Sequence, residues 1–154
     1  MILRQAGFAD LDTATLYALL QLRSEVFVVE QNCVYRDLDG RDLDPDTLHL
    51  WLAEGDTPVA YLRMLHDPDG TARIGRVVTD ARHRGAGHAA RLMDAAVATL
   101  APDTPAVLEA QVYATKLYER SGFVIDGEPY LDDGIEHVHM RLKRLGENTL
   151  TASS

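Results

Sequence analysis

The sequence VVTDARHRGAGHA, from Val77 to Ala89, stands between an apolar stretch and a long amphipathic one. Glycine at positions 85 and 87 lets backbone N–H groups turn toward a ligand, because glycine has no Cβ atom and adopts positive φ angles readily. The start of a helix just after these glycines adds positive potential, and the side chains of Arg82 and Arg84 flank it. The stretch therefore predicts an anion-binding turn at a helix N-terminus.

Nucleotide-binding loops of two known kinds are the first alternatives for this turn. A Walker-type loop is excluded because no Gly-Lys-Ser or Gly-Lys-Thr follows. The letters of a dinucleotide-binding loop do fit at Gly85, Gly87 and Ala90, and Glu109 lies near the expected offset for an acidic residue. That interpretation is disfavoured because six residues separate Val78 from the first glycine, whereas a dinucleotide loop comes directly off its strand.

The hydrophobic pattern on both sides of the turn predicts a mixed α/β sheet. Apolar stretches predict strands at 2–8, 48–54, 59–65, 71–79, 106–110 and 135–142, with a further strand from Phe123 onward. Helical spacing predicts helices from Asp12 into the 26–30 region, over 85–100 and over 114–121. The three strands between 48 and 79 should form an antiparallel meander, and the strand–helix–strand unit at 71–110 should be parallel and right-handed.

Composition is typical of one globular domain. The chain has 154 residues, 46% of them hydrophobic, and we expect a single domain at 1–145 followed by a frayed polar tail at 146–154. No stretch approaches the roughly 20 apolar residues of a membrane span, and no signal peptide is recognisable, so a cytoplasmic location is expected. The single cysteine, Cys33, excludes an internal disulfide and a thiolate metal cluster.

The charge balance bears on the partners of the protein. Lys and Arg number 15 against 24 Asp and Glu, a net charge of -9, which disfavours nucleic acid and suits a cationic or amine-bearing small partner. Five acids between Asp37 and Asp46, together with Gly40 and Pro45, predict a solvated acidic loop. A calcium loop is excluded there because Gly40 stands at the fourth position and Leu48 at the twelfth.

Two spaced motifs resemble those of the GNAT acetyltransferase superfamily. Arg82-x-x-Gly85-x-Gly87, repeated in the next register as Arg84-x-x-Gly87-x-Ala89, resembles the pyrophosphate loop R/Q-x-x-G-x-G/A. Downstream, Gln111-x-x-Ala114-x-x-x-Tyr118-x-x-x-Gly122-Phe123 resembles the segment N-x-x-A-x-x-x-Y-x-x-x-G-F. The sequence departs from these patterns at Gln111, where Asn is usual, and at Ala81, where Pro is frequent. The segments LRSEVFVVEQ at 22–31 and DGIEH at 133–137 are similar to the ElaA-like branch.

The resemblance covers residues 2–143 and implies a fold and a co-substrate. The fold is a mixed, mostly antiparallel central sheet flanked by helices, in which a splayed parallel strand pair binds acyl-CoA. The co-substrate is acetyl-CoA, with no metal, and the acetyl group passes to an amine by direct attack in a ternary complex. The residues implied to bind the cofactor are Val77, Val78, Thr79, Arg82, Arg84, Gly85, Ala86, Gly87, His88, Ala89 and Gln111.

Tyr118 is the catalytic residue that the resemblance implies, as the group facing the leaving thiolate. Proton transfer from a phenol of pKa about 10 to a thiolate near 8.5 is uphill by roughly 2 kcal/mol, so hydrogen bonding to the nascent thiolate supplies most of its effect. The general base is left open. The candidates are Glu25, Glu30, His49, Glu109, His137 or a chain of water molecules.

Other chemistries receive less support from the sequence. His137 and His139 share one face of the last strand, but a metal pair lacks a third ligand at suitable spacing. Nothing beside Cys33 lowers the pKa of a thiol, which disfavours a ping-pong scheme. The alternative function is a catalytically silent acyl-CoA-binding or protein-interaction module with a GNAT fold. The acceptor, the use of other acyl-CoAs and the formation of a homodimer are left open.

Overall fold

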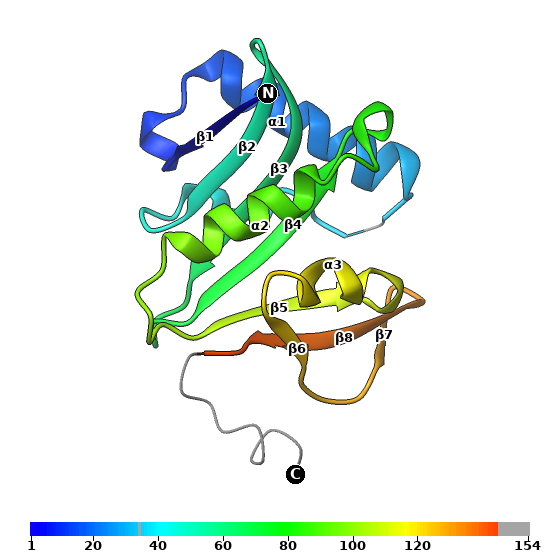
Figure 1. Ribbon diagram of the computed structural model, residues 1–154. Helices are drawn as coiled ribbons and strands as arrows, with labels where there is room; N and C mark the ends of the chain where they lie inside the picture. The colour runs from blue at the N-terminus through cyan, green and yellow to red at the C-terminus, as the bar shows by residue number, and fades with distance from the viewer. Residues whose placement is uncertain (34, 145–154) are drawn as a thin grey trace.

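In a computed structural model that describes residues 1–33 and 35–144, eight strands form one sheet (Figure 1). The strands are β1 (Ile2–Ala6), β2 (Leu48–Glu54), β3 (Thr57–His66), β4 (Ala72–Thr79), β5 (Ala106–Gln111), β6 (Phe123–Ile125), β7 (Tyr130–Asp132) and β8 (Ile135–Leu142). Their order is β1-β2-β3-β4-β5-β8-β6, and β7 also pairs with β8. Only the β4–β5 pair is parallel in this part of the chain. The mixed, mostly antiparallel sheet with one parallel pair is thereby confirmed.

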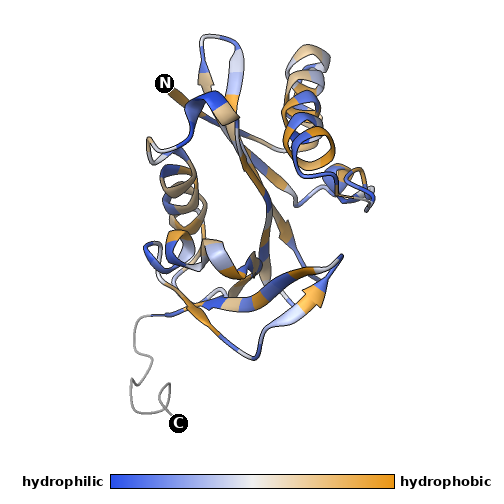
Figure 2. Ribbon diagram, turned by 90° about the vertical axis from the view of Figure 1, so that its right-hand side faces the viewer, coloured by the Kyte–Doolittle hydropathy of each residue, from blue (hydrophilic) through white to orange (hydrophobic). Residues whose placement is uncertain are grey.

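Helices cover both faces of the sheet (Figure 2). One face carries α2 (His88–Ala98) and α3 (Thr115–Glu119), and the opposite face carries α1 (Thr13–Arg23). Because side chains alternate along a strand, each face has its own core. The core on the α2 face includes Leu50, Leu62, Leu92, Leu108, Tyr118 and Met140. The core on the α1 face includes Leu19, Phe27, Trp51, Tyr61 and Val78.

The first helix begins as predicted at Asp12, whose side chain accepts a hydrogen bond of 2.7 Å from the backbone N–H of Thr15. It ends as an α-helix at Arg23 and continues as a π-helix over Ser24–Glu30. The wider turn of this segment packs Val26 and Phe27 into the core on the α1 face. The predicted reach into the 26–30 region is thus confirmed.

A β-bulge in β4 opens the sheet. The register between β3 and β4 shifts between Tyr61 and Arg63, and Arg76 adopts φ 53°, a value that is uncommon outside glycine. Beyond the bulge β4 does not follow β5, because the two strands pair only at Ala72 with Ala106 and at Arg73 with Val107. The splayed parallel pair that the resemblance implied is therefore present.

The turn that is predicted to bind an anion follows the C-terminal end of β4. Gly85 and Gly87 have φ 83° and 79°, in the left-handed region, and Gly87 is the N-cap of α2. The helix starts at His88, three residues later than predicted, because the two glycines form the turn instead of the first helical residues. Asp80 caps the short 3-10 turn Ala81–His83 by accepting from the N–H of Arg82 at 3.2 Å.

The segment after Phe123 differs from the prediction of one strand. It forms two short strands, β6 and β7, on either side of Gly127 and Pro129. Gly127 has φ 122°, and a proline lacks the N–H that a sheet ladder needs, so one continuous strand cannot form. The strand interruption brings Tyr130 opposite His137 on β8.

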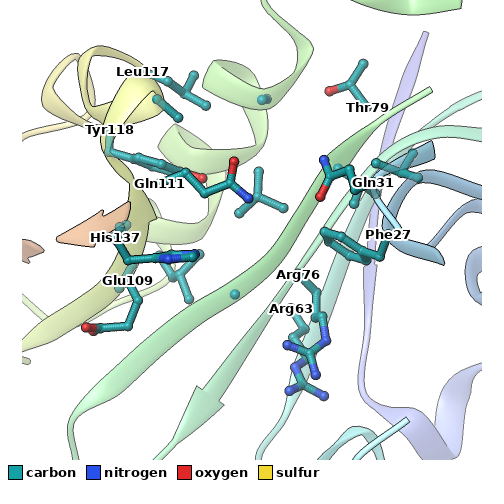
Figure 3. A pocket seen from close by; sticks show the side chains of 18 of the residues that line it. Phe27, Gln31, Arg63, Arg76, Thr79, Glu109, Gln111, Leu117, Tyr118 and His137 are labelled. Atoms are coloured by element: carbon teal, nitrogen blue, oxygen red, sulfur yellow. The ribbon is translucent and has the colours of Figure 1, made fainter. Parts of the chain in front are cut away.

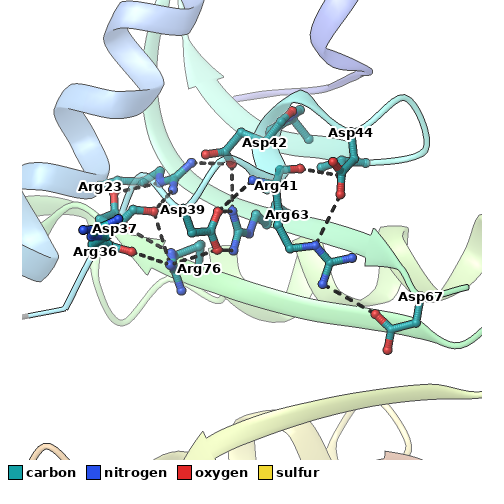
Figure 4. Close-up of polar contacts among 12 residues, drawn as sticks. Arg23, Arg36, Asp37, Asp39, Arg41, Asp42, Asp44, Arg63, Asp67 and Arg76 are labelled. Carbon is teal, nitrogen blue, oxygen red and sulfur yellow. Dashed lines mark hydrogen bonds and ion pairs between the residues drawn. The ribbon is translucent and has the colours of Figure 1, made fainter.

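The prediction of a solvated acidic loop is wrong for three of its five acids, which pair with arginines. Asp42 is only 7% exposed and accepts hydrogen bonds from Arg23 at 2.8 Å and from Arg63 at 3.0 Å. Asp37 and Asp39 pair with the same group of arginines and with Arg76 (Figure 4). We call Arg23, Arg63, Arg76, Asp37, Asp39 and Asp42 the Arg–Asp network. Its three positive charges neutralise three of the five loop acids.

No helix within residues 1–33 and 35–144 is long and apolar enough to cross a membrane. The expected frayed tail at 146–154 lies outside the described residues.

Candidate active site

A cleft of about 750 Å³ lies where β4 and β5 diverge (Figure 3). From the α2 side, Ala89, Leu117 and Tyr118 line it, and from the α1 side, Phe27 and Gln31 do so. Because the sheet is open at this point, the cleft is accessible to groups from both faces. The remaining lining residues include Glu30, Tyr35, Arg63, Arg73, Arg76, Val77, Val78, Thr79, Arg84, Glu109, Gln111, Asp132, Asp133 and His137.

The edge of β4 supplies backbone groups to the cleft. Val77, Val78 and Thr79 all line it, yet the side chain of Val78 is only 3% exposed and packs in the core on the α1 face. A ligand can therefore meet Val78 only through the backbone. Because no ladder pair with β5 forms after Arg73, the N–H and C=O groups on this side are available to an extended chain.

The anion-binding turn stands at one end of this edge. Gly85, Ala86 and Gly87 are exposed, and His88 and Ala89 begin α2. The first N–H groups of an α-helix have no acceptor within the helix, and a Cβ atom at Gly85 or Gly87 would meet nothing within 4 Å. The turn thus has both the free donors and the open space that a diphosphate requires.

The two arginines of the turn have different surroundings. Arg84 lines the cleft and donates to both carboxylate oxygens of Glu30, at 2.5 and 2.8 Å, and to the carbonyl oxygen of Thr79 at 3.1 Å. The side chain of Arg82 is 82% exposed and contacts Asp80 at 3.2 Å outside the cleft. Of the two registers of the loop motif, the one that begins at Arg84 places its arginine at the cleft.

Tyr118 is held by α3 at the inner wall of the cleft and is 9% exposed. Burial raises the pKa of its phenol to about 12. Transfer of that proton to a thiolate of pKa about 8.5 would be uphill by roughly 5 kcal/mol. The side chain is therefore suited to donate a hydrogen bond to a leaving thiolate without giving up its proton.

The candidate bases fall into two groups. Glu30, Glu109 and His137 line the cleft, whereas Glu25 and His49 do not. His49 is buried, with Nδ1 2.7 Å from the Tyr61 hydroxyl and Nε2 3.1 Å from the Asp42 carbonyl oxygen, and burial lowers its pKa. Both ring nitrogens thus have structural partners.

Glu109 anchors a polar group that the sequence analysis missed. Its carboxylate accepts a hydrogen bond from the Tyr130 hydroxyl at 2.8 Å and lies 2.5 Å from Nδ1 of His139. The Tyr130 ring in turn stacks on His137, with centroids 5.9 Å apart and an interplanar angle of 25°. Tyr130 belongs to the strand that was not predicted, so no signal in the sequence placed it here.

Phe27, Gln31, Tyr35 and Arg76 are further cleft residues that the sequence analysis did not identify. A helical apolar pattern does give Phe27 a core role, but only the π-helical turn directs it toward the cleft as well. Cys33 does not line the cleft, and burial raises the pKa of its thiol. Within residues 1–33 and 35–144, no three His, Cys, Asp or Glu side chains are grouped to hold a metal ion.

Comparison with known proteins identifies the family of the chain. Residues 14–144 match the model of the acetyltransferase (GNAT) domain family. The chain belongs to that family. Its fold and membership support an acyl-CoA-dependent N-acyltransferase, in which an acyl group passes from coenzyme A to an amine.

Individual members of the family are similar to this chain over most of its length. A UPF0039 protein of Mycobacterium tuberculosis is 49% identical over 142 residues, covering 90% of each chain. Protein ElaA of Escherichia coli is 42% identical over 137 residues, covering 86% of this chain and 90% of ElaA. The crystal structure of ElaA matches with a TM-score of 0.86 at 38% identity, covering 92% of this chain and 99% of ElaA. An acyl-CoA N-acyltransferase of Pseudomonas aeruginosa matches with a TM-score of 0.85 at 44% identity, covering 93% of this chain and 100% of that one.

Proposed function

We propose that the protein transfers the acetyl group of acetyl-CoA to a primary amine of a small-molecule or peptide acceptor in the cytoplasm. The observation that carries this proposal is the cleft between β4 and β5, which has the α2 N-terminus at one end and Tyr118 on its wall. A slot of this kind can hold a thioester carbonyl beside an entering amine, so that much of the rate comes from positioning.

Coenzyme A is expected to bind along the edge of β4. The backbone of Val77, Val78 and Thr79 would pair with the pantetheine arm as an additional strand would. The N–H groups of the turn and of the first residues of α2 would hold the diphosphate, with Arg84 and Arg82 as cationic neighbours. Gln111, at the end of β5, would contact the arm from the other side. The turn residues in this assignment are Gly85, Ala86, Gly87, His88 and Ala89.

The proposed reaction is a direct attack in a ternary complex. The amine nitrogen forms a bond to the thioester carbon, and the carbon–sulfur bond breaks with its electron pair remaining on sulfur. Tyr118 donates a hydrogen bond to that sulfur, where charge accumulates in the transition state. An acyl-enzyme on Cys33 is not needed, and Cys33 lies outside the residues that line the cleft.

The acceptor is proposed to be cationic. The reason is the charge at the cleft itself, not the net charge of the whole chain. Three of the five acids of the 37–46 loop are neutralised within the Arg–Asp network. The support comes instead from Asp132 and Asp133, which line the cleft at the turn between β7 and β8. A second positive charge on the acceptor would be favoured near these carboxylates.

Release of free thiol from acetyl-CoA tests the proposal. The wild-type protein is incubated with acetyl-CoA and a panel of polyamines, aminoglycosides, amino acids and peptides with free N-termini, and calorimetry measures acetyl-CoA binding separately. Saturable binding with amine-dependent thiol release is expected. Binding without release for any amine would favour a catalytically silent acyl-CoA-binding module, and absence of binding would contradict the cofactor assignment.

A further inference from the structure

The cleft is open to both faces of the sheet. Some of its polar side chains come from the α1 face and others from the α2 face. On β8, Val138 and Met140 point into the core of the α2 face, so His137, which directly precedes Val138, points to the α1 face. On β5 the same alternation places Leu108 on the α2 face and Gln111 on the α1 face. Tyr118 belongs to the core of the α2 face.

His137 and Tyr118 therefore reach the same cleft from opposite faces, and both are seen there in Figure 3. Acyl transfer is accelerated when the entering nitrogen and the leaving sulfur each have a polar group of their own. One stabilises the sulfur that leaves, and the other removes a proton from the nitrogen that enters. If Tyr118 donates a hydrogen bond to the sulfur from the α2 face, a base on the α1 face is placed to take the proton from the nitrogen.

The hydrogen bond of the His137 ring determines which nitrogen is basic. Nδ1 lies 2.8 Å from the carbonyl oxygen of Ile135, and a carbonyl oxygen can only accept. Nδ1 must therefore carry the proton of the neutral ring, which leaves the lone pair on Nε2. Within residues 1–33 and 35–144, Nε2 makes no hydrogen bond.

The ring is also held in place. It stacks on Tyr130 of β7, and the Tyr130 hydroxyl donates to Glu109 of β5 at 2.8 Å, so Glu109 fixes the ring on which the imidazole rests. The two glutamates at the cleft are less suited to accept a proton. Arg84 lowers the pKa of Glu30, and both oxygens of Glu109 already have partners in Tyr130 and His139.

From these contacts we infer that His137 is the general base of the proposed acyl transfer, with Tyr130 and Glu109 as its positioning residues. Nε2 takes one proton from the attacking amine nitrogen as the C–N bond forms, and the resulting imidazolium returns that proton to solvent after the thiolate has left. The inference rests on the proposed function. It selects one residue in one tautomer from the six alternatives for the base, which are five side chains and a chain of water molecules.

Other titratable and charged groups lie near the His137 ring and could contribute to the pH profile of the rate. The titratable and charged groups that line the same part of the cleft or flank His137 are Glu109, Tyr130, Asp132, Asp133, Glu136, His139, Tyr35, Arg73 and Arg76. Carboxylic acids, phenols and guanidinium groups ordinarily titrate outside the range of about pH 5 to 8, so a limb of the rate profile within that range is assigned to an imidazole. His139 is the second imidazole near the cleft, and it serves as the matched control.

The kinetic test compares His137→Gln and His139→Gln with the wild type, with the best acceptor from the amine panel. His137→Gln is expected to lower kcat at least 100-fold and to abolish the acid limb of the pH profile, with acetyl-CoA affinity by calorimetry unchanged. His139→Gln should change kcat less than 5-fold and keep that limb. Imidazole added to a His137→Gly variant should restore part of the rate. A His137→Gln enzyme with a wild-type rate and pH profile would overturn the inference while leaving the proposed function intact.

Nuclear magnetic resonance gives a readout that needs no acceptor. In protein labelled with 15N at histidine, the neutral His137 ring, assigned by its loss in His137→Gln, should show the Nδ1–H tautomer. Free histidine side chains in water favour the Nε2–H tautomer, so this result is specific to the contact with Ile135. An Nε2–H ring at this position would contradict the inference, whatever the amine panel shows.

Discussion

Arg84 donates hydrogen bonds to both oxygens of Glu30, at 2.5 and 2.8 Å, and so joins the anion-binding turn to the π-helix on the opposite side of the cleft. The pair raises the pKa of Arg84 and lowers that of Glu30, so both stay charged at neutral pH. A carboxylate is thus fixed beside the proposed diphosphate site. Its charge opposes the binding of an anion and competes for Arg84.

Replacing Glu30→Gln should therefore strengthen acetyl-CoA binding, by about 2- to 5-fold at low salt, because it removes one negative charge and frees Arg84. Calorimetry at 20 and 200 mM NaCl measures the change, which should shrink at the higher salt. Glu25→Gln is the matched control, since Glu25 makes the same change of charge away from the cleft. Weaker binding by Glu30→Gln would mean that Glu30 holds Arg84 in place for the phosphate.

The turn itself is tested by Gly87→Glu, which puts a carboxylate at the N-cap of α2. Acetyl-CoA binding should be lost within the range of calorimetry, since the new anion occupies the place of the diphosphate. Gly55→Glu is the control because Gly55 also has a positive φ, 62°, and open space around it, but lies in the turn between β2 and β3. Loss of binding in both variants would indicate misfolding, and retained binding in Gly87→Glu would remove the loop assignment.

Tyr118→Phe removes the hydroxyl without disturbing the packing of the ring in the α2-face core. We expect kcat to fall about 10- to 100-fold, the range for one strong hydrogen bond to a charged atom, with acetyl-CoA affinity changed less than 2-fold. Thiol release and calorimetry separate the two effects. Tyr17→Phe, on the exposed side of α1, should leave both quantities unchanged. An unchanged kcat in Tyr118→Phe would exclude a role for the hydroxyl.

The Arg–Asp network predicts a large loss of stability from Asp42→Asn. Asp42 is buried between Arg23 and Arg63, and breaking a buried ion pair costs about 3 kcal/mol in the free energy of unfolding. Asp44→Asn, where the carboxylate is exposed and lies 3.3 Å from Arg41, should cost less than about 0.5 kcal/mol. Urea denaturation at pH 7 measures both. An equal loss of unfolding free energy in the two variants would contradict a stabilising role of the Asp42 ion pairs.

The same network predicts the direction of the pH dependence. Burial by itself raises the pKa of Asp42, but the hydrogen bonds and charges of Arg23 and Arg63 outweigh it, and the net pKa lies below the usual value of 3.8. A carboxyl whose pKa is lower in the folded state contributes stability above its unfolded pKa and loses it as the pH falls through the folded pKa. The wild type should therefore lose stability between pH 5 and pH 3 more steeply than Asp42→Asn. Parallel curves of unfolding free energy against pH would be inconsistent with this account.

The sequence predicts those parts of the fold that depend on local signals. Asp12 identifies the start of α1, Gly85 and Gly87 identify the turn before α2, and nearly continuous apolar stretches identify β2 and β3. These features are set by side-chain chemistry within a few residues of the place where they act. Tyr118 and the turn could be placed at one site because the two motifs flank the parallel strand pair.

The parts that escaped prediction depend on contacts between distant residues. Arg76, at the bulge with its positive φ, has its guanidinium 2.9 Å from Asp37 and donates to the Arg36 carbonyl oxygen at 3.2 Å, and these partners are 39 and 40 residues away in sequence. The composition of residues 37–46 predicts a solvated loop. The three arginines that pair with Asp37, Asp39 and Asp42 belong to other elements, so nothing within the segment indicates them. The stacking of Tyr130 on His137 likewise depends on a strand of three residues, too short for a periodic signal.

A crystal structure with bound acetyl-CoA tests the central claim most directly. The account predicts that the diphosphate contacts the backbone N–H groups of residues 85–89, that the pantetheine arm runs along Val77 to Thr79, and that the sulfur lies within hydrogen-bond distance of the Tyr118 hydroxyl. A thioester bound elsewhere on the molecule, or with its sulfur far from Tyr118, would contradict it.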